Sequence, residues 1–404
     1  MMSLVICLMH SATRAYKGLT MTALEILFYL FAFFCAYSYF IYPLILKLLP
    51  TRQVEGFSTE TEPDVADLSM LSLIITVHNE ESRIQEKIDN TLAINYPAEK
   101  LDIIIASDFS TDRTEEIVSF YEDRGVRLVR ADQRKGKEYA QLCAILESKG
   151  EILVFSDVAT HIPADSLLLL ESRFTDPQVG ALSSEDQFVS NDGSIVGEGA
   201  YVKYEMWLRR LESERAGLVG LSGSFFAARR EVCEDWDICA PSDFNTALNS
   251  ARHGLVAITC PDVVGIYKDV KDPGLEYRRK MRTVIRGITA VARHPEVLNP
   301  FRLGMFAFQV WSHKIMRWGV PWFMAVFFAL TLMLQGQGDI YQYALIAQLA
   351  FYAVAASGWL STTLRNNTIV KIIYFFVQTN LALAHATVMF MLGKRMTVWT
   401  PSKR

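Results

Sequence analysis

The sequence predicts an α/β domain with a parallel sheet, flanked at both ends by membrane helices. Apolar runs of strand length alternate with segments of helical spacing from residue 70 onward, which is typical of strands joined by crossover helices. Hydrophobic residues make up 51% of the 404 residues, and their excess lies in residues 22–49 and after residue 318. A purely soluble chain of this length rarely has that distribution.

The apolar run over residues 22–49 exceeds the roughly 20 residues that cross a hydrocarbon core, so it predicts a membrane helix. A cleaved signal peptide is the alternative, but this run is too long and lacks a small-residue cleavage site. Residues 1–21 form an N-terminal extension to which we assign no function. Residues 50–69 are polar and acidic, which is typical of a solvated linker.

The α/β domain is predicted over residues 70–290, and its first half reads as a regular alternation. Strands are expected at 71–77, 101–107, 126–131 and 151–157, and helices at 80–94, 111–123 and 136–150. Thr111 is the expected cap of the second helix. The handedness rule for such units then gives a right-handed parallel sheet.

After Pro163 the alternation loosens. A long helix is expected over 197–217 and a Gly- and Ser-rich turn over 220–230, and a less regular half would suit a wall that binds a second substrate.

Residues 301–318 mix aromatic and basic side chains, and they predict an amphipathic helix lying in the membrane interface. Trp311 and Trp318 would lie at headgroup level, and Lys314 and Arg317 would reach lipid phosphates. A plain juxtamembrane basic cluster is the alternative, and either interpretation puts the domain on the inner face. Membrane helices follow over 319–393, before a basic tail at 394–404. Basic residues mark cytoplasmic loops, but the last loop and the tail are both basic and would lie on opposite sides of a single membrane crossing. The side of the membrane on which the tail lies therefore stays open.

Two acids stand where strand-like runs stop, Asp108 after the second predicted strand and Asp157 after the fourth. Because the carboxyl ends of parallel strands open onto one crevice, these carboxylates should converge on the same ligand. Asp243 stands shortly before a further change of pattern at 255–260. Such clustering suggests a cation and phosphates. The net charge of −4, with no basic stripe, gives no sign of nucleic-acid binding.

Six motifs follow one another along the chain. They are VHNEES, SDFSTDRT, RKGK, FSDVATHIPADSL, GLSGSFFAARR and PSDF. In this order the chain resembles the inverting family 2 glycosyltransferases with a GT-A fold, a Rossmann-like nucleotide-sugar domain. The similarity is greatest to the membrane-bound branch related to cellulose, hyaluronan and poly-N-acetylglucosamine synthases, and it covers nearly the whole chain.

The resemblance implies that His78, Asn79, Glu80 and Asp108 line the nucleotide pocket, with Asp108 accepting a hydrogen bond from the base. Lys137 would neutralise the diphosphate. The alternatives are a helix-capping role for Asp108 and an ordinary solvated surface position for Lys137.

Asp157 matches the first acid of the family's DxD motif, where Mg²⁺ or Mn²⁺ bridges carboxylate and diphosphate. Ala159 replaces the second acid, so metal affinity is weak or His161 contributes. Asp243 matches the family's general base, and capping of the following helix is its alternative. Ser222, Gly223 and Ser224 would bound the acceptor pocket.

The family's processive members carry a Gln-x-x-Arg-Trp element. This chain has Arg278, Arg279 and Arg282 at the corresponding place, a candidate diphosphate clamp without the Gln and Trp. The resemblance implies a membrane enzyme with a cytoplasmic domain that moves a sugar from a UDP-type donor to a lipid-linked or glycan acceptor. Other polysaccharide-assembly proteins are expected partners. A degenerate member that serves as a membrane scaffold is the alternative, suggested by Ala159 and by Phe109 in place of glycine.

Overall fold

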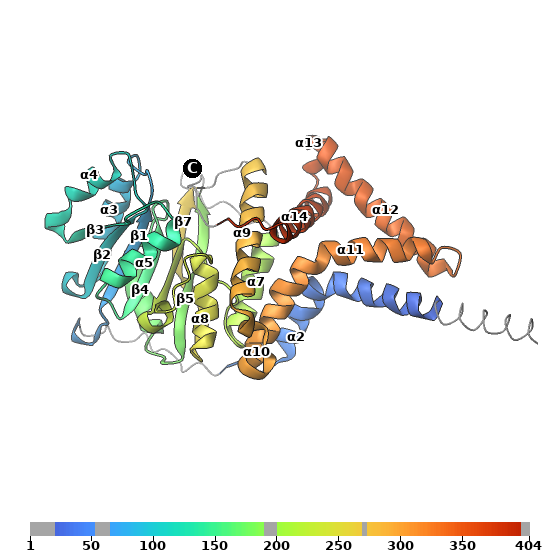
Figure 1. Cartoon of the computed structure of the whole chain (residues 1–404), viewed down its shortest axis with the longest axis horizontal. Helices are drawn as coiled ribbons and strands as arrows, with labels where there is room; N and C mark the ends of the chain where they lie inside the picture. Colours follow the sequence, from blue (N-terminus) through green and yellow to red (C-terminus); the bar gives the residue numbers. More distant parts are fainter. Residues whose placement is uncertain (1–20, 53–64, 190–199, 269–272, 397–404) are drawn as a thin grey trace, which may run out of the picture. The chain divides into compact units, whose positions relative to one another are not determined.

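The computed structural model describes residues 21–52, 65–189, 200–268 and 273–396 (Figure 1). Most of the predicted N-terminal extension and linker, and residues 397–404 of the tail, lie outside the described residues. The chain divides into two compact units. The helical unit comprises residues up to 44 with 274–284 and 312–389, and the sheet unit comprises 45–273 and 285–311 with the C-terminal residues.

A mixed seven-stranded sheet forms the centre of the sheet unit. Its strands are β1 (Leu71–Val77), β2 (Leu101–Ser107), β3 (Val126–Arg130), β4 (Ile152–Asp157), β5 (Val179–Val189), β6 (Phe225–Arg229) and β7 (Val256–Lys268). They lie in the order β3-β2-β1-β4-β6-β5-β7. β1 to β4 are parallel as the alternation predicts, and β5 is parallel to β7. β6 is antiparallel to β4 and β5, so the sheet is mixed rather than wholly parallel.

Helices cover both faces of this sheet (Figure 1). The helices are α3 (Ile84–Leu92), α4 (Thr114–Ser119), α5 (Lys137–Glu147), α6 (Ser166–Arg173), α7 (Ala200–Ser213) and α8 (Ser242–Arg252). β1 is buried along its whole length, and its successive side chains point to opposite faces. Leu73 and Ile75 pack in one core with residues of α3 and α6, and Ile74 packs in the other with residues of α5 and α8.

Stacked rings tie the antiparallel strand to the parallel half of the sheet. The ring centroid of Phe155 on β4 lies 4.8 Å from that of Phe226 on β6 and 5.0 Å from that of Trp236. The Trp236 indole N–H also donates to the backbone oxygen of Glu138, at 2.9 Å. These contacts bury large apolar surfaces while the one polar atom of the indole stays bonded.

The predicted cap at Thr111 is wrong. The N–H and hydroxyl of Thr111 both donate to Asn79 Oδ1, at 2.8 and 3.3 Å, and α4 begins only at Thr114. Asp112 Oδ1 instead accepts the N–H of Thr114 at 3.0 Å. The reason is that a long-range contact to the loop after β1 takes the hydroxyl that local capping would have used.

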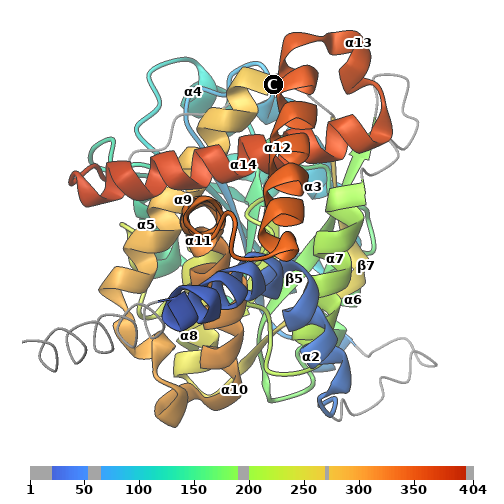
Figure 2. The same cartoon turned by 90° about the vertical axis from the view of Figure 1, so that its right-hand side faces the viewer.

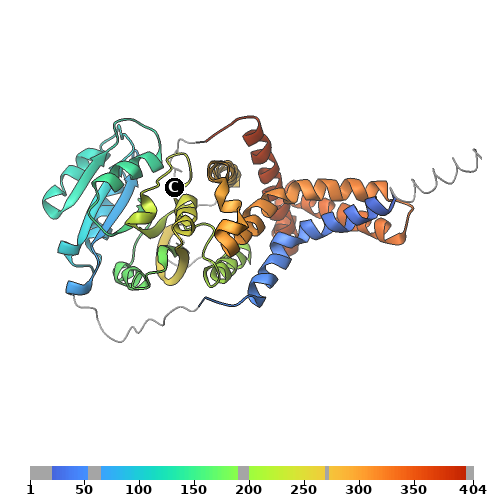
Figure 3. The same ribbon diagram turned by 60° about the horizontal axis from the view of Figure 1, so that its bottom comes forward.

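Four helices are long and apolar enough to cross a membrane, namely Met21–Leu48, Pro300–Met333, Asp339–Leu360 and Thr368–Met391. The first contains a π-helical turn, η1 (Tyr37–Ile41), before α2 (Tyr42–Leu48), and the last two are α12 and α14, joined by the short α13 (Thr362–Arg365). The helices of this unit can be followed in Figure 2, and Figure 3 shows the first helix beside α11 (Met316–Met333). Phe28 packs against Phe327 and Tyr341, each with ring centroids 5.0 Å apart.

The segment predicted as an interfacial helix over 301–318 does not end at residue 318 but continues into the next helix. α10 (Pro300–Val310), kinked at Gly304, leads through the π-helical turn η7 (Trp311–Ile315) into α11. The expectation that Arg317 reaches lipid phosphates is wrong, because its side chain is buried with the guanidinium 4.9 Å from the ring centroid of Tyr39. An interfacial position of the remaining segment stays a prediction.

Candidate functional site

The loops after β1 and β2 meet at Asp108, which is fully buried. A ring nitrogen of His78, Nδ1, lies 2.8 Å from the Asp108 backbone oxygen. Asp108 Oδ1 accepts the backbone N–H groups of Lys135 and Gly136, at 3.1 and 3.0 Å. The carboxylate therefore holds the loop before α5 rather than the turn that follows it, and the capping alternative is wrong.

The other oxygen of this carboxylate, Asp108 Oδ2, is buried and has no hydrogen-bond partner among the described residues. Leaving a buried acceptor unsatisfied costs about 1–3 kcal/mol. Gly136 adopts a φ of 105°, a left-handed conformation that glycine reaches without a Cβ penalty, and so presents its N–H to Oδ1. The loop is thus arranged to hold Asp108 with one acceptor unused.

Asn79 and Glu80 brace the same pair of loops. Asn79 has a positive φ of 53°, and its Oδ1 accepts from the loop after β2. The Glu80 N–H donates to Thr114 Oγ1 at 2.8 Å, and its buried carboxylate pairs with Arg83 at 2.5 Å. Burial raises the pKa of Glu80, although the Arg83 charge opposes the change.

Lys137 is the first residue of α5, and its ammonium joins two parts of the crevice. Its Nζ donates to Asp157 Oδ1 at 2.6 Å and to the backbone oxygen of Gly223 at 2.8 Å. The Lys137 side chain is only 10% exposed, against 27% for Asp157. The alternative of a solvated surface lysine is therefore wrong.

The turn at 222–224 lies between Asp157 and Asp243. The Asp157 N–H donates to the Ser224 backbone oxygen at 2.9 Å. A Cβ added at Gly223 would lie only 3.1 Å from Asp243 Oδ2, so the absence of a side chain lets that carboxylate approach the turn. The backbone N–H of Leu221 also donates to the Asp243 backbone oxygen at 3.2 Å. One compact site thus contains Lys137, both acids and the predicted acceptor turn.

Asp243 lies in the first turn of α8, which begins at Ser242. The N-cap residue is Pro241, and no side chain caps the helix there. The capping alternative for Asp243 is therefore wrong, since its carboxylate faces Gly223. Its role as a base stays a prediction.

The structure adds a buried cation that sequence reasoning missed, Lys87 on α3. Its Nζ donates to the Oγ of Ser156, the residue before Asp157, at 2.8 Å and to the Thr160 backbone oxygen at 2.6 Å. Burial lowers the pKa of Lys87 to about 7, while the charge of Asp157 acts in the opposite direction. Helical spacing could have flagged it, because Lys87 shares an apolar stripe with Ile84 and Ile88.

The candidate clamp residues Arg278, Arg279 and Arg282 lie on α9 (Pro273–Arg293) in the part that belongs to the helical unit. There Lys280 Nζ donates to Thr379 Oγ1 at 2.9 Å. The clamp role of the three arginines stays a prediction.

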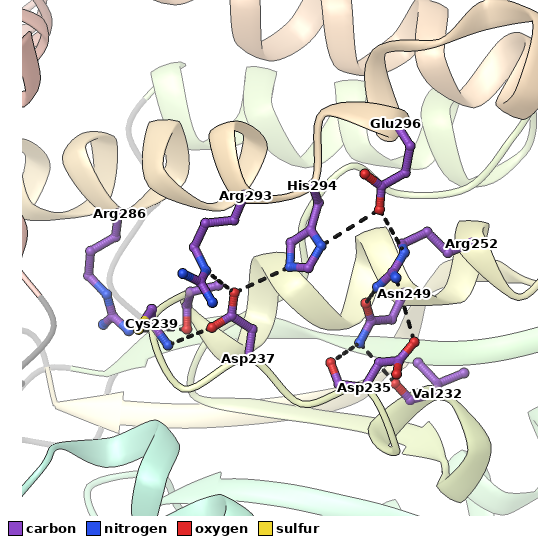
Figure 4. A network of polar contacts seen from close by, with 11 residues as sticks. Val232, Asp235, Asp237, Cys239, Asn249, Arg252, Arg286, Arg293, His294 and Glu296 are labelled. Carbon is purple, nitrogen blue, oxygen red and sulfur yellow. Dashed lines mark hydrogen bonds and ion pairs between the residues drawn. The ribbon is translucent and has the colours of Figure 1, made fainter.

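The last part of α9 belongs to the sheet unit and holds the neighbourhood of α8 through a polar network (Figure 4). Arg293 and His294 both approach Asp237 Oδ2, at 2.5 and 3.3 Å. Arg252, at the end of α8, pairs with Glu296 at 3.1 Å. The helix that bears Asp243 is therefore fixed at its far end.

Asp157 is the carboxylate of this site that is predicted to hold a divalent cation, and it already pairs with Lys137. The described residues contain no group of three or more His, Cys, Asp or Glu side chains that could hold a metal ion. His161 is exposed, and its Nε2 lies 3.5 Å from Asn90 Nδ2, so a contribution of His161 to the metal stays a prediction. This donor set fits only an ion that takes most of its ligands from a substrate and from water.

Comparisons with known proteins identify this domain. Residues 72–236 match the model of glycosyl transferase family 2. The chain is 26% identical over 197 residues to a poly-beta-1,6-N-acetyl-D-glucosamine synthase of Staphylococcus aureus, covering 46% of this chain and 47% of the synthase. It is 25% identical over 179 residues to a beta-monoglucosyldiacylglycerol synthase of a Nostoc species, covering 42% of this chain and 38% of that enzyme. The chain thus spans about half or less of the length of the curated relatives it matches.

The fold also has a solved counterpart. A mannosyltransferase of Pyrobaculum calidifontis, solved in complex with GDP-Man and Mn²⁺, superposes with a TM-score of 0.66 at 22% identity. The match covers 92% of this chain and all of that one. The predicted GT-A architecture is therefore confirmed.

Proposed function

Since residues 72–236 form a glycosyl transferase family 2 domain, we propose that the chain is an inverting transferase for a sugar carried by a nucleotide, a UDP-sugar in particular. The proposed acceptor is lipid-linked or a polysaccharide at the membrane. The observation that carries this proposal is the bridge from Lys137 to both Asp157 and Gly223, which puts a cation for the leaving diphosphate beside Asp243.

The donor would bind in the crevice at the ends of β1, β2 and β4. Asp108 Oδ2 has no hydrogen-bond partner among the described residues and is the proposed acceptor for the ring N–H of uracil, which the covering loops would have to move to admit. His78, Asn79 and Glu80 hold the surrounding loops, as their contacts support. Lys137 would neutralise the diphosphate as a compact positive charge.

The cofactor we propose is Mg²⁺ or Mn²⁺, held on the protein side by Asp157. A hard cation of this kind accepts one or two carboxylates and completes its shell with phosphate oxygens and water, which suits the single acid. When bound, the ion supplies positive charge that stabilises the leaving diphosphate. The Mn²⁺ in the mannosyltransferase complex supports this assignment.

Asp243 is the proposed general base. Its carboxylate would take the proton of the acceptor hydroxyl as that oxygen bonds to the anomeric carbon, and the bond from this carbon to the diphosphate oxygen breaks. Attack from the face opposite the diphosphate inverts the anomeric configuration. Ser222, Gly223 and Ser224 would bound the acceptor, and Arg278, Arg279 and Arg282 would clamp the diphosphate.

The relatives and the four apolar helices support an acceptor at the membrane. We place the sheet unit on the cytoplasmic face, where nucleotide sugars are available, with other polysaccharide-assembly proteins as partners. Transfer of one sugar to a lipid, the kind of product that the name of the Nostoc relative describes, fits the missing Gln and Trp of the processive element. A scaffold without catalysis is the competing function, favoured by Ala159 in place of the second acid.

A donor-hydrolysis screen tests the proposal. The purified full chain in lipid nanodiscs is mixed with UDP-glucose, UDP-galactose, UDP-N-acetylglucosamine or GDP-mannose, with Mg²⁺ or Mn²⁺, and nucleoside diphosphate release is measured. We expect one UDP-sugar to be cleaved, and Asp157→Ala to lose metal-dependent UDP binding in calorimetry while the fold is kept. Ala159→Asp should tighten the metal. A wild type inert toward every donor would favour the scaffold.

A further inference from the structure

A polar cluster centred on Asp186 and Tyr267, neither of which has a role in the proposed reaction, adjoins the turn at 222–224. Asp186 on β5 accepts at Oδ1 from the hydroxyls of Ser222 at 2.5 Å, Tyr267 at 2.7 Å and Ser224 at 3.4 Å. Tyr267 comes from β7, and its hydroxyl also contacts that of Ser224. Three hydroxyls from two other segments therefore converge on a single carboxylate oxygen.

The Asp186 carboxylate has an unused oxygen. Within the described part of the chain it makes no ion pair, and no residue donates a hydrogen bond to its Oδ2. The arginines nearby are engaged elsewhere, since Arg210 pairs with Glu185 at 2.9 Å and Arg209 donates to Ser183 Oγ at 2.5 Å. Such a carboxylate, only partly buried, is a strong acceptor for hydroxyl groups brought by a ligand.

Tyr267 is held in the state that suits this cluster. Its side chain is almost fully buried, and burial, followed by the charge of Asp186, raises its pKa well above the ordinary value, so the phenol keeps its proton. Gly265 leaves room for the ring, because a Cβ there would lie 3.0 Å from the Tyr267 hydroxyl oxygen. The irregular pairing of β5 with β7 lies nearby, between Ser184 and Glu185.

The position of the cluster relates it to the transferred sugar. Ser222 and Ser224 flank Gly223, whose carbonyl oxygen binds Lys137 and whose α-carbon faces Asp243. The Ser224 carbonyl oxygen accepts the N–H of Asp157. The cluster therefore adjoins the segment between the proposed diphosphate site and the proposed base, where two sugars must meet during transfer.

We propose that Asp186, together with Tyr267, Ser222 and Ser224, is a subsite that binds the hydroxyl groups of a hexopyranose. The inference deepens the proposed function and rests on it, because it assigns the residues that recognise the sugar. Two sources could supply these hydroxyls, the hexose of the donor and the terminal hexose of the acceptor.

The test compares Asp186→Asn with Glu185→Gln, the same carboxylate-to-amide change at the next residue of β5. Dissociation constants for UDP and for UDP-N-acetylglucosamine or UDP-glucose, whichever wild type binds more tightly, are measured by calorimetry with Mn²⁺ on the full chain in nanodiscs. Binding of cellobiose to the UDP-loaded protein is measured by saturation-transfer NMR. Thermal midpoints are recorded on the same preparations, and Tyr267→Phe replaces Asp186→Asn if the latter does not fold.

If the donor hexose binds here, Asp186→Asn weakens the UDP-sugar about tenfold or more and leaves UDP unchanged, since a hydrogen bond to a charged group contributes about 1.5–3 kcal/mol. If the acceptor hexose binds here, only cellobiose weakens. Glu185→Gln should change neither.

The subsite is refuted if Asp186→Asn binds every probe as wild type does. It is also refuted if the affinities for UDP and for the UDP-sugar fall equally and the thermal midpoint is lowered, because that result indicates a structural role alone. A wild type that binds no nucleotide would instead overturn the proposed donor site, and the two failures are therefore distinguishable.

Discussion

Replacing Asp243 with Asn should remove turnover while the fold survives. The change removes no side-chain hydrogen bond or ion pair of Asp243 with another described residue, and its carboxylate faces Gly223. A negative charge in the first turn of a helix contributes about 0.3–1 kcal/mol. For a domain of this size that shifts the thermal midpoint by about 1–4 °C. Loss of a general base lowers the rate by about 10² to 10⁴.

The assay measures release of nucleoside diphosphate with acceptor, UDP-sugar affinity and thermal midpoint on one preparation. Affinity should stay near the wild-type value, because the proposed base touches the acceptor and not the donor. Asp235→Asn is the matched control, the same change at an acid 57% exposed that pairs with Arg252 at the far end of α8. Turnover of Asp243→Asn above about a tenth of wild type would end the general-base assignment.

Three further changes are expected to have measurable effects. Lys137→Gln should weaken UDP binding about tenfold or more in calorimetry, since it removes a charge-assisted contact. Lys135, whose ammonium lies over the Tyr139 ring, is the control, and Lys135→Gln should not weaken UDP binding. Equal effects of the two changes would argue against the Lys137 role. Phe109→Gly should raise the thermal midpoint, because the positive φ of 56° costs a non-glycine residue about 1–2 kcal/mol. A lower thermal midpoint would show that the contact of the Phe109 ring with Arg130 outweighs the strain. Burial raises the pKa of Asp237, but hydrogen bonds and charge from Arg293 outweigh burial and leave it below the ordinary value. The Asp237 carboxylate therefore stabilises the fold fully above its ordinary pKa of about 4, and this stabilisation is lost as the pH falls from there through the lowered pKa. Arg293→Ala should flatten the acid side of the profile of stability against pH.

The first half of the sheet could be predicted because its strands are continuous apolar runs between helical segments. β1 and β4 are buried almost throughout, so their sequences carry the signal themselves. β6 and β5 could not be predicted in the same way. The β6 segment follows Gly and Ser residues that indicate a turn, and β5 mixes polar with apolar residues, so both strands depend on pairing with partners distant in sequence.

The site shows the same division. Asp108, Asp157 and Asp243 could be found because they stand at changes of pattern within ordered motifs. Asp186 and Tyr267 could not, because an acid and an aromatic residue 81 positions apart give no sign that they touch. The hydrogen bonds of Lys87 to Ser156 and Thr160 span 69 and 73 positions of the chain, so the sequence gives no sign of them either. The place of Lys87 on an apolar helix face was nevertheless a usable signal.

The ion pair between Lys137 and Asp157 has a consequence for handling the protein. The Lys137 ammonium already balances Asp157, the acid proposed for the metal. Removing divalent ions with a chelator should therefore leave Asp157 paired, and the protein should tolerate storage in EDTA. The demand for a metal arises when a nucleotide adds negative charges that a single lysine does not balance. Chelation would then inhibit the enzyme reversibly rather than denature it.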